Sequence, residues 1–298
     1  MSLTAARLTT FLAVVDSGSA RAAARLLHVT ESAVSASLAA LRREVGVALF
    51  EKDGRALRLT AAGEAFAPYA RRILGLIDEG TIESRAAGVT QAHRLRLGAV
   101  TTAGEYLVPG LLATFRARHP EVDLTLEVGV RDSVLAHLAD HQLDAVIAGR
   151  PPVGSGLVSM ATRANSLVVV SAPGAAADLP TATWLLREPG SGTRATTLAL
   201  LAALEYDPPT LSLGSAGAVI ASAALGLGVT IAATDAVASR VAAGELEQRT
   251  LAGTPLKRPW HVLTAAGPTQ AALLFVGHVA STDAGDLRFR PRSVRVRT

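Results

Sequence analysis

Residues 23–50 read AARLLHVTESAVSASLAALRREVGVALF, and this stretch decides the fold of the N-terminal part of the chain. Its second half predicts one amphipathic helix, because Val34, Leu38 and Leu41 recur at spacings of four and three. Thr30 can cap the start of that helix. A shorter helix precedes it, and its many alanines allow two short helices to cross closely. The stretch therefore predicts a helix-turn-helix.

A generic helical bundle is the alternative interpretation, since short amphipathic helices are common. Against it, residues 23–50 fit without a gap the pattern A-A-x-x-L-x-V-T-x-S-A-V-S-x-x-L-x-x-L-x-x-x-x-G-V-x-L-F. This pattern resembles the DNA-binding head of the LysR-type transcriptional regulators. A second stretch, the octet REPGSGTR (187–194), resembles the branch of that family that includes Calvin-cycle and sulfur-metabolism regulators. The resemblance implies a winged helix-turn-helix over 1–60, a linker helix over 61–90 and a two-lobed α/β effector domain over 91–298. The effector domain is expected to be similar to periplasmic solute-binding proteins.

The resemblance places the second helix of the head in the major groove of double-stranded DNA, with the start of the helix near base edges. The following segment, 51–60, reads as a hairpin that turns at Asp53-Gly54 and contacts phosphates. Where the family often has Gln, Arg and Gln, this chain has Glu31, Ala36 and Ser37. These residues lack the long side chains that make bidentate contacts to base edges, so we expect fewer direct base contacts and more recognition of DNA shape. The residues expected to contact DNA are Thr30, Glu31, Ser32, Ser35, Ala36, Ser37, Arg42, Lys52, Arg55 and Arg58.

The connector has a heptad-like seam, in which Phe66, Tyr69, Ile73 and Leu76 follow at spacings of three, four and three. One interpretation is an amphipathic helix packed on its own domain. The resemblance favours a different one, a helix that pairs two chains in a homodimer or homotetramer and presents two heads to a two-fold site.

From about residue 93 short apolar strands alternate with helices, which is the rhythm of a mostly parallel sheet. A second unit of this kind begins near 167, so two lobes with a cleft between them are expected. Lobe I would span about 91–165 and 265–287, and lobe II about 166–264, although the segment 259–267 looks like the strand that returns to lobe I. The arginine-rich tail, 288–298, is expected to be disordered.

Two segments carry the polar groups expected in the cleft. Thr101 and Thr102 lie where a strand meets a helix, and REPGSGTR (187–194) combines a turn, two hydroxyls and a helix start. For either threonine alone, simple helix capping is an equal alternative. The residues expected to bind a small anionic effector are Thr101, Thr102, Arg131, Gly190, Ser191, Gly192 and Thr193.

The roles of two arginines near the predicted cleft are ambiguous. Arg131 and Arg194 could be counter-charges for an anion, but either could instead be a solvated or lobe-bridging residue. The segment 216–220 is apolar where the family usually has a polar cluster, so the effector of a family branch does not transfer to this chain directly.

Composition excludes several classes of protein. The 298 residues contain no cysteine, no phosphate loop and no nucleophile elbow, so neither an enzyme nor a cofactor is expected. His137 and His141 lie four residues apart, but their segment is polar and no metal is expected there. The net charge is +4, with a basic head and a mildly acidic middle.

The sequence shows no export signal and no membrane span, so a cytoplasmic protein is expected. The alternative function is a solute-binding protein that does not act on DNA.

Overall fold

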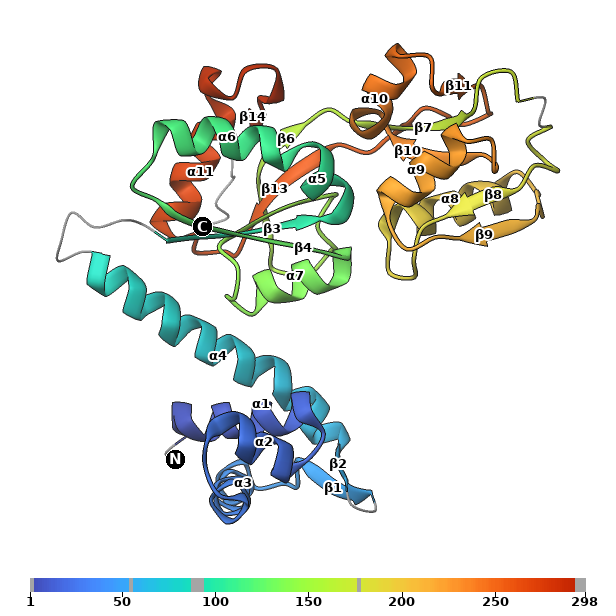
Figure 1. Cartoon of the computed structure of the whole chain (residues 1–298). Helices are drawn as coiled ribbons and strands as arrows, with labels where there is room; N and C mark the ends of the chain where they lie inside the picture. The colour runs from blue at the N-terminus through green and yellow to red at the C-terminus, as the bar shows by residue number, and fades with distance from the viewer. Residues whose placement is uncertain (1–2, 54–55, 87–93, 176–177, 293–298) are drawn as a thin grey trace. The chain divides into compact units, whose positions relative to one another are not determined.

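The computed structural model describes residues 3–53, 56–86, 94–175 and 178–292 (Figure 1). The chain divides into two compact units, one made of residues 1–90 with 140–142 and the other of 91–139 with 143–298. In the described part of the chain, no helix is both long enough and apolar enough to cross a membrane.

The first unit contains a trihelical head, a hairpin and a long helix. Its elements are α1 (Ala5–Ser17), α2 (Ala20–Leu27), α3 (Glu31–Val45), β1 (Phe50–Asp53), β2 (Ala56–Leu59) and α4 (Ala61–Ala86). Side-chain caps define the helix starts, because Ser19 accepts from the Ala22 N–H and Thr30 accepts from the Ala33 N–H at 3.2 Å. His28 forms the tight connection between α2 and α3 in the left-handed region, with φ of +55°.

The core of the head is where α1, α3, the hairpin and the start of α4 meet. Leu8, Phe11 and Leu41 are fully buried there. The ring of Phe11 lies 5.3 Å from that of Phe50 and 5.4 Å from that of Phe66. Gly63 permits this close packing, since a Cβ at that position would lie 2.1 Å from the Leu49 carbonyl oxygen.

Lobe I of the second unit is a six-stranded sheet with helices packed against it. Its strand order is β14-β6-β13-β5-β3-β4. Its elements are β3 (Arg94–Val100), α5 (Thr101–Tyr106), α6 (Val108–Arg118), β4 (Asp123–Gly129), α7 (Arg131–Ala139), β5 (Ala145–Ala148), β6 (Val158–Arg163), β13 (Trp260–Thr264), α11 (Gln270–Ala280), the 3-10 helix η1 (Thr282–Leu287) and β14 (Arg290–Pro291).

Lobe II is built around β7, which pairs antiparallel with β10, β11 and β12, beside a two-stranded β8-β9 sheet. Its elements are β7 (Ser166–Ser171), β8 (Trp184–Leu186), α8 (Gly192–Ala203), β9 (Thr210–Ser212), α9 (Ala216–Ala224), β10 (Thr230–Ala233), α10 (Thr234–Ala242), β11 (Glu247–Arg249) and β12 (Leu256–Lys257).

The prediction of a mostly parallel sheet is wrong. In the sheet of lobe I only β3, β4 and β5 pair in parallel, while β13 and β14 pair antiparallel with their neighbours; in lobe II β8 and β9 pair in parallel but β7 pairs antiparallel with its three partners. The reason is the chain path: β6 leads out of lobe I toward lobe II and β13 returns beside it, so the two strands run in opposite directions. Because β13 begins at Trp260, the return to lobe I falls near residue 258 rather than at 265.

The expectation of a disordered tail is also wrong for its first five residues. Phe289 is fully buried in the core of the second unit, and its N–H donates to the Val279 carbonyl at 2.7 Å. Arg290 and Pro291 then pair with β6 at the edge of the sheet. One aromatic side chain among the arginines therefore fixes this segment; residues 293–298 lie outside the described residues.

Candidate functional site

Helix α3 presents a polar face to solvent at its first turns. Val34 and Leu41 point into the head and are fully buried, which leaves the opposite face free. The exposed residues on that side include Thr30, Glu31, Ser32, Ser35, Ala36 and Arg42, whereas Ser37 is half-buried. The Thr30 and Ser32 hydroxyls lie 2.9 Å apart, so part of their hydrogen-bonding capacity is used within the cap.

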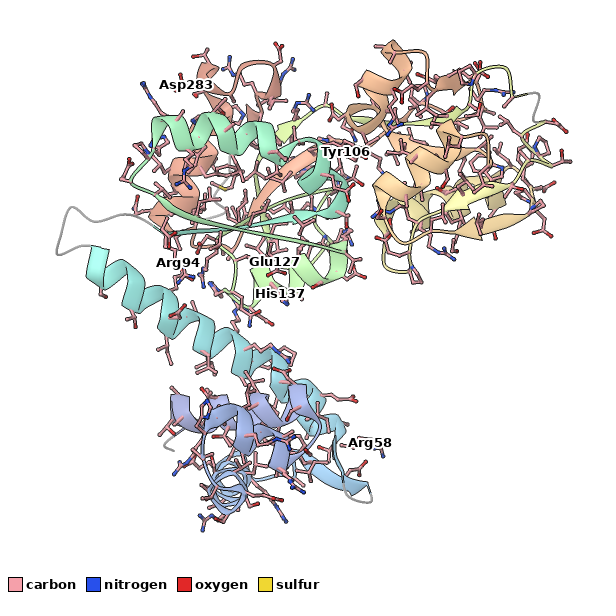
Figure 2. All side chains as sticks on the ribbon, viewed as in Figure 1. Arg58, Arg94, Tyr106, Glu127, His137 and Asp283 are labelled. Carbon is pink, nitrogen blue, oxygen red and sulfur yellow. The ribbon has the colours of Figure 1, made fainter. Side chains whose placement is uncertain are left out.

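The hairpin pairs Phe50–Asp53 with Ala56–Leu59 in antiparallel register. Figure 2 shows Arg58 projecting from it. Its guanidinium forms an ion pair with Glu51 on the neighbouring strand, a pairing that the sequence pattern did not indicate. Lys52 lies in β1, and Arg55 lies outside the described residues.

The predicted seam of α4 is only partly exposed. Tyr69, Ile73 and Leu76 are 65%, 37% and 47% exposed, and Ile77 at 49% extends the same apolar face. Phe66 is a correction, because its ring packs against Phe11 in the core of the head instead of lying on that face. The spacing of three from Phe66 to Tyr69 could not reveal that the first turns of α4 are already covered by α1.

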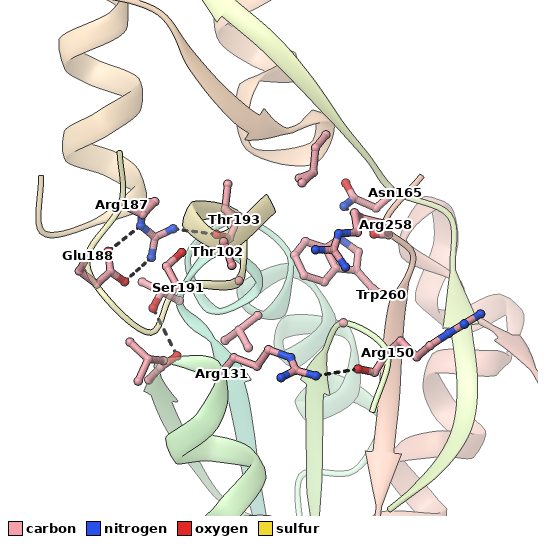
Figure 3. Close-up of a pocket in the computed structure, with 18 residues that line it drawn as sticks. Thr102, Arg131, Arg150, Asn165, Arg187, Glu188, Ser191, Thr193, Arg258 and Trp260 are labelled. Carbon is pink, nitrogen blue, oxygen red and sulfur yellow. Dashed lines mark hydrogen bonds and ion pairs between the residues drawn. The ribbon is translucent and has the colours of Figure 1, made fainter. Parts of the chain in front are cut away.

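The second unit has a cavity of about 250 Å³ between its lobes. Lobe I contributes the ends of β3, β4 and β5, and lobe II contributes the loop before α8 (Figure 3). The crossing segments supply the remaining wall. The lining residues are Val100, Thr101, Thr102, Gly129, Val130, Arg131, Gly149, Arg150, Asn165, Leu167, Arg187, Glu188, Ser191, Gly192, Thr193, Ala195, Arg258 and Trp260.

Arg187 is the most deeply held cation of this cavity, with a side chain only 6% exposed. Its Nε and Nη2 donate to the Glu188 carboxylate at 2.8 and 2.7 Å, and its Nη1 donates to the Thr102 hydroxyl of lobe I at 3.1 Å (Figure 3). The Arg187 hydrogen bond lowers the pKa of Glu188, against the effect of burial. The pair is therefore ionised at neutral pH and joins the two lobes.

Two further guanidiniums lie at the cavity, and neither has a carboxylate partner as close as Glu188 is to Arg187; the Arg150 side chain instead points away from the cavity (Figure 3). Arg131 donates to the Arg150 carbonyl at 3.0 Å and lies 3.4 Å from Asp132, whose side chain is 80% exposed. Arg258 donates to the Thr196 hydroxyl. Glu188 is the one carboxylate among the described lining residues, so the cavity carries a positive excess.

In the octet 187–194 some residues shape the turn and cap helix α8, and others line the cavity. Gly190 adopts φ of +84° and makes the turn against Val130. Ser191 caps α8 by accepting from the Arg194 N–H, while Gly192 and Thr193 line the cavity at the start of that helix. The positive end of the α8 dipole therefore adds to the charge of the arginines.

Residues behind and beside the octet have different roles. Arg194 donates to the Arg187 carbonyl at 2.7 Å and to the Ser212 hydroxyl, so it braces the loop. The Thr101 hydroxyl donates to the Gly129 carbonyl at 3.3 Å. Behind Arg187 and Thr193, the apolar face of α9 closes a second space of only about 10 Å³.

Sequence reasoning missed Arg150, Asn165, Arg187, Arg258 and Trp260 as lining residues. Arg187 was present in the quoted octet, and its position directly after a strand was the available signal. Arg150 follows the end of β5, and Asn165, Arg258 and Trp260 lie on the crossing segments, where no local pattern marks a residue as facing a cavity.

The two histidines that lie four residues apart in the sequence do not lie in the same compact unit. His137 Nδ1 lies 2.6 Å from a Glu127 carboxylate oxygen, and Figure 2 shows the two side chains close together. His141 lies in the other compact unit, at a left-handed turn with φ of +57°. Among the described residues no group of three or more His, Cys, Asp or Glu could hold a metal ion.

Comparison with known proteins decides the family. Residues 90–283 match the family model described as LysR substrate binding domain, and residues 5–64 match that of the bacterial regulatory helix-turn-helix protein, lysR family. The chain belongs to the LysR family of transcriptional regulators. It is thus a DNA-binding regulator with an effector-binding domain, not an enzyme.

Named relatives and solved structures agree with the LysR assignment. The chain is 33% identical over 271 residues to the transcriptional regulator CfxR of Cupriavidus necator, covering 88% of this chain and 85% of CfxR. It is 32% identical over 253 residues to CbbR of Rhodospirillum rubrum, covering 82% and 84%. CbnR complexed with its target DNA is 25% identical with a TM-score of 0.62, covering 93% and 98%.

One solved regulatory domain contains a ligand. The CcmR regulatory domain of Synechocystis PCC6803, in complex with 2-PG, is 28% identical with a TM-score of 0.58, covering 62% of this chain and 95% of that domain.

Proposed function

We propose that this LysR-family regulator binds promoter DNA as a paired assembly and that a small anionic metabolite, held between the lobes, changes that binding. The observation that carries the proposal is the charge of the cavity: the guanidiniums of Arg131, Arg187 and Arg258 and one helix start face a single carboxylate. Such an excess is compensated best by an anion with several oxygens, because guanidinium pairs with oxyanions through two parallel hydrogen bonds.

The head supports the DNA half of the proposal. The exposed start of α3 carries hydroxyls and one carboxylate, with Arg42 further along toward where the DNA backbone would lie. CbnR, a relative by fold and sequence, is known as a complex with its target DNA. CbbR relatives and a RuBisCO operon regulator make a carbon-fixation promoter the first candidate target. Such a regulator would act in the cytoplasm.

Pairing is proposed through the apolar face of α4, namely Tyr69, Ile73, Leu76 and Ile77. Side chains of this size on one helix face are costly to leave in water, and a second copy of the same helix covers them by two-fold symmetry. A dimer, or a tetramer made from two dimers, would present paired heads to one operator.

DNA binding is tested by retardation of the DNA just upstream of the protein's own gene over a series of salt concentrations. Arg42→Ala should weaken binding and reduce the slope of log affinity against log salt by about one. Arg43→Ala is the matched control, because Arg43 is expected on the solvated face. If the parent, Arg42→Ala and Arg43→Ala show equal slopes of log affinity against log salt, Arg42 does not contact DNA.

Effector binding is tested by thermal shift with a panel of phosphate, sulfate, phosphorylated acids and 2-PG, since a ligand of the folded state must raise the melting temperature. The change Ser191→Ala with Thr193→Ala should abolish the effector response and leave DNA binding intact. Ser191 also caps α8, so Thr193→Val serves as the second variant because it preserves the cap. Thr210→Ala, on the exposed strand β9, is the control. A panel without any shift would refute the anionic effector.

A further inference from the structure

One carboxylate of lobe II holds both segments that cross between the lobes. Asp235, in the first turn of α10, accepts at its Oδ2 from Arg163 Nη1 at 2.6 Å and from Trp260 Nε1 at 2.8 Å. The Arg163 and Asp235 side chains are 18% and 23% exposed, and Trp260 is 7% exposed. Both hydrogen bonds are therefore largely shielded from water, where an ion pair and an indole N–H depend strongly on their partner.

The two donors stand at the points where the chain leaves and re-enters lobe I. Arg163 is the last residue of β6 and Trp260 the first residue of β13, and the two are partners in the antiparallel register. Beyond them the crossing segments are joined to each other, because Asn165 and Arg258 exchange two hydrogen bonds of 2.9 Å. Asp235 thus connects helix α10 of lobe II to the lobe I ends of the two crossing segments.

Trp260 also belongs to the wall of the cavity, next to Arg258 and Asn165 (Figure 3). An indole ring is a large, rigid surface with a single donor, so the hydrogen bond to Asp235 fixes how the ring stands in the wall. The same carboxylate holds the ring and the crossing strand. A ligand that moves the Trp260 ring therefore also disturbs its hydrogen bond to Asp235, the residue that holds the crossing segments.

We propose that Asp235 is the positioning residue that transmits occupation of the cavity to the two crossing segments. It acts through Trp260 and Arg163, and does not itself touch the effector. The proposal rests on the effector function proposed above, but its structural part holds in the ligand-free protein. Loss of the carboxylate releases the indole and uncouples ligand binding from the response on DNA, while the cavity keeps its arginines.

The chain contains only two tryptophans, which makes the test direct. Trp184 lies in the core of lobe II, and Trp184→Phe leaves Trp260 as the single tryptophan, whose emission is excited selectively at wavelengths that the three tyrosines do not absorb. In this background we compare Asp235→Ala, which removes both acceptor bonds, with Asp235→Asn, which keeps an acceptor for the indole. Glu245→Ala is the matched control, because it removes a 2.8 Å ion pair with Arg240 on the surface of the same helix.

Without ligand, Asp235→Ala should shift the Trp260 emission to longer wavelength and raise its quenching by acrylamide at least about twofold, because the indole loses its partner. Asp235→Asn and Glu245→Ala should leave both values near those of the parent. Unchanged quenching in Asp235→Ala overturns the proposal. If Asp235→Ala does not fold, Trp260→Phe, in the chain that keeps Trp184, takes its place in the experiment with DNA.

The second arm uses inorganic phosphate and 2-PG at constant ionic strength. Asp235→Ala should keep a ligand-induced rise in melting temperature but lose the ligand-dependent change in DNA retardation that the parent and Glu245→Ala show. A DNA response equal to that of the parent overturns the proposal. If neither probe affects even the parent, the proposed effector function fails, and the ligand-free comparison alone decides the role of Asp235.

Discussion

The ion pair between Arg187 and Glu188 gives the sharpest quantitative prediction. Arg187→Met removes two charge-assisted hydrogen bonds and one to Thr102, and it leaves a carboxylate whose side chain is only 20% exposed. Breaking a fully buried pair in this way costs about 3–5 kcal/mol. Partial access of water to Glu188 reduces this, so we expect a loss of about 2–3 kcal/mol.

Thermal unfolding followed by circular dichroism measures the loss. For a unit of this size each kcal/mol lowers the melting temperature by about 2–4 °C, so Arg187→Met should unfold about 5–10 °C earlier. Glu188→Gln should also destabilise, because it removes the counter-charge of the buried Arg187 guanidinium and replaces one of the two acceptor oxygens with an NH2 donor.

The double variant decides whether the two losses share one cause. Arg187→Met with Glu188→Gln contains no unpaired buried charge, so it should be more stable than the sum of the single changes predicts, with a coupling energy of about 1–3 kcal/mol. Additive losses would refute the argument that these two side chains form one buried pair. The pH dependence gives a second check: since Arg187 lowers the pKa of Glu188, the pair stabilises the fold above the pKa of an unfolded glutamate and is lost as the pH falls through the folded pKa.

Three further outcomes follow from other parts of the molecule. Glu51→Gln should free Arg58 from its ion pair and raise affinity for any duplex, steepening the salt dependence of retardation by about one unit of slope. Tyr69→Asp with Leu76→Asp should shift the protein to monomers in sedimentation experiments and weaken binding to a two-half-site operator more than to a half-site. Burial lowers the pKa of His278, so on acidification the histidine is protonated in the unfolded chain before it is protonated in the folded one. The melting temperature should therefore fall as the pH drops through about 6.5, the pKa of an unfolded histidine. His278→Gln should make that fall smaller.

The sequence predicted the head well because its signals are local. Val34 and Leu41 mark the buried face of α3, and Thr30 marks its first turn, so the spacing alone sets which residues face outward. Phe66 shows where this reasoning ends. It has the same spacing as the exposed residues of α4, but the ring of Phe11 covers it from another helix, and no periodicity encodes that contact.

The cavity was predicted only where it touches recognisable local motifs. Thr101 and Thr102 follow a strand, and Thr193 starts a helix, so both ends of the site could be anticipated. Arg258 and Trp260 come to the cavity because the chain crosses twice between the lobes, and the position of the second crossing depends on how β13 pairs with β6. Such a pairing is a property of the whole sheet.

The hydrogen bonds already made by Arg187 limit what an effector can gain in the cavity. Arg187 already holds Glu188 and Thr102, so a neutral ligand that needed this guanidinium would replace good hydrogen bonds with weaker ones. An oxyanion can instead use Arg131 and Arg258, which have no strong carboxylate partner among the described residues, and leave the Arg187 bridge in place. Because a ligand shifts an equilibrium only by its differential affinity for the two states, the proposed effector would act on the lobes through these outer arginines. Arg131 belongs to lobe I and Arg258 to a crossing segment beside Trp260, so an anion shared between them pulls on the segment that Asp235 holds.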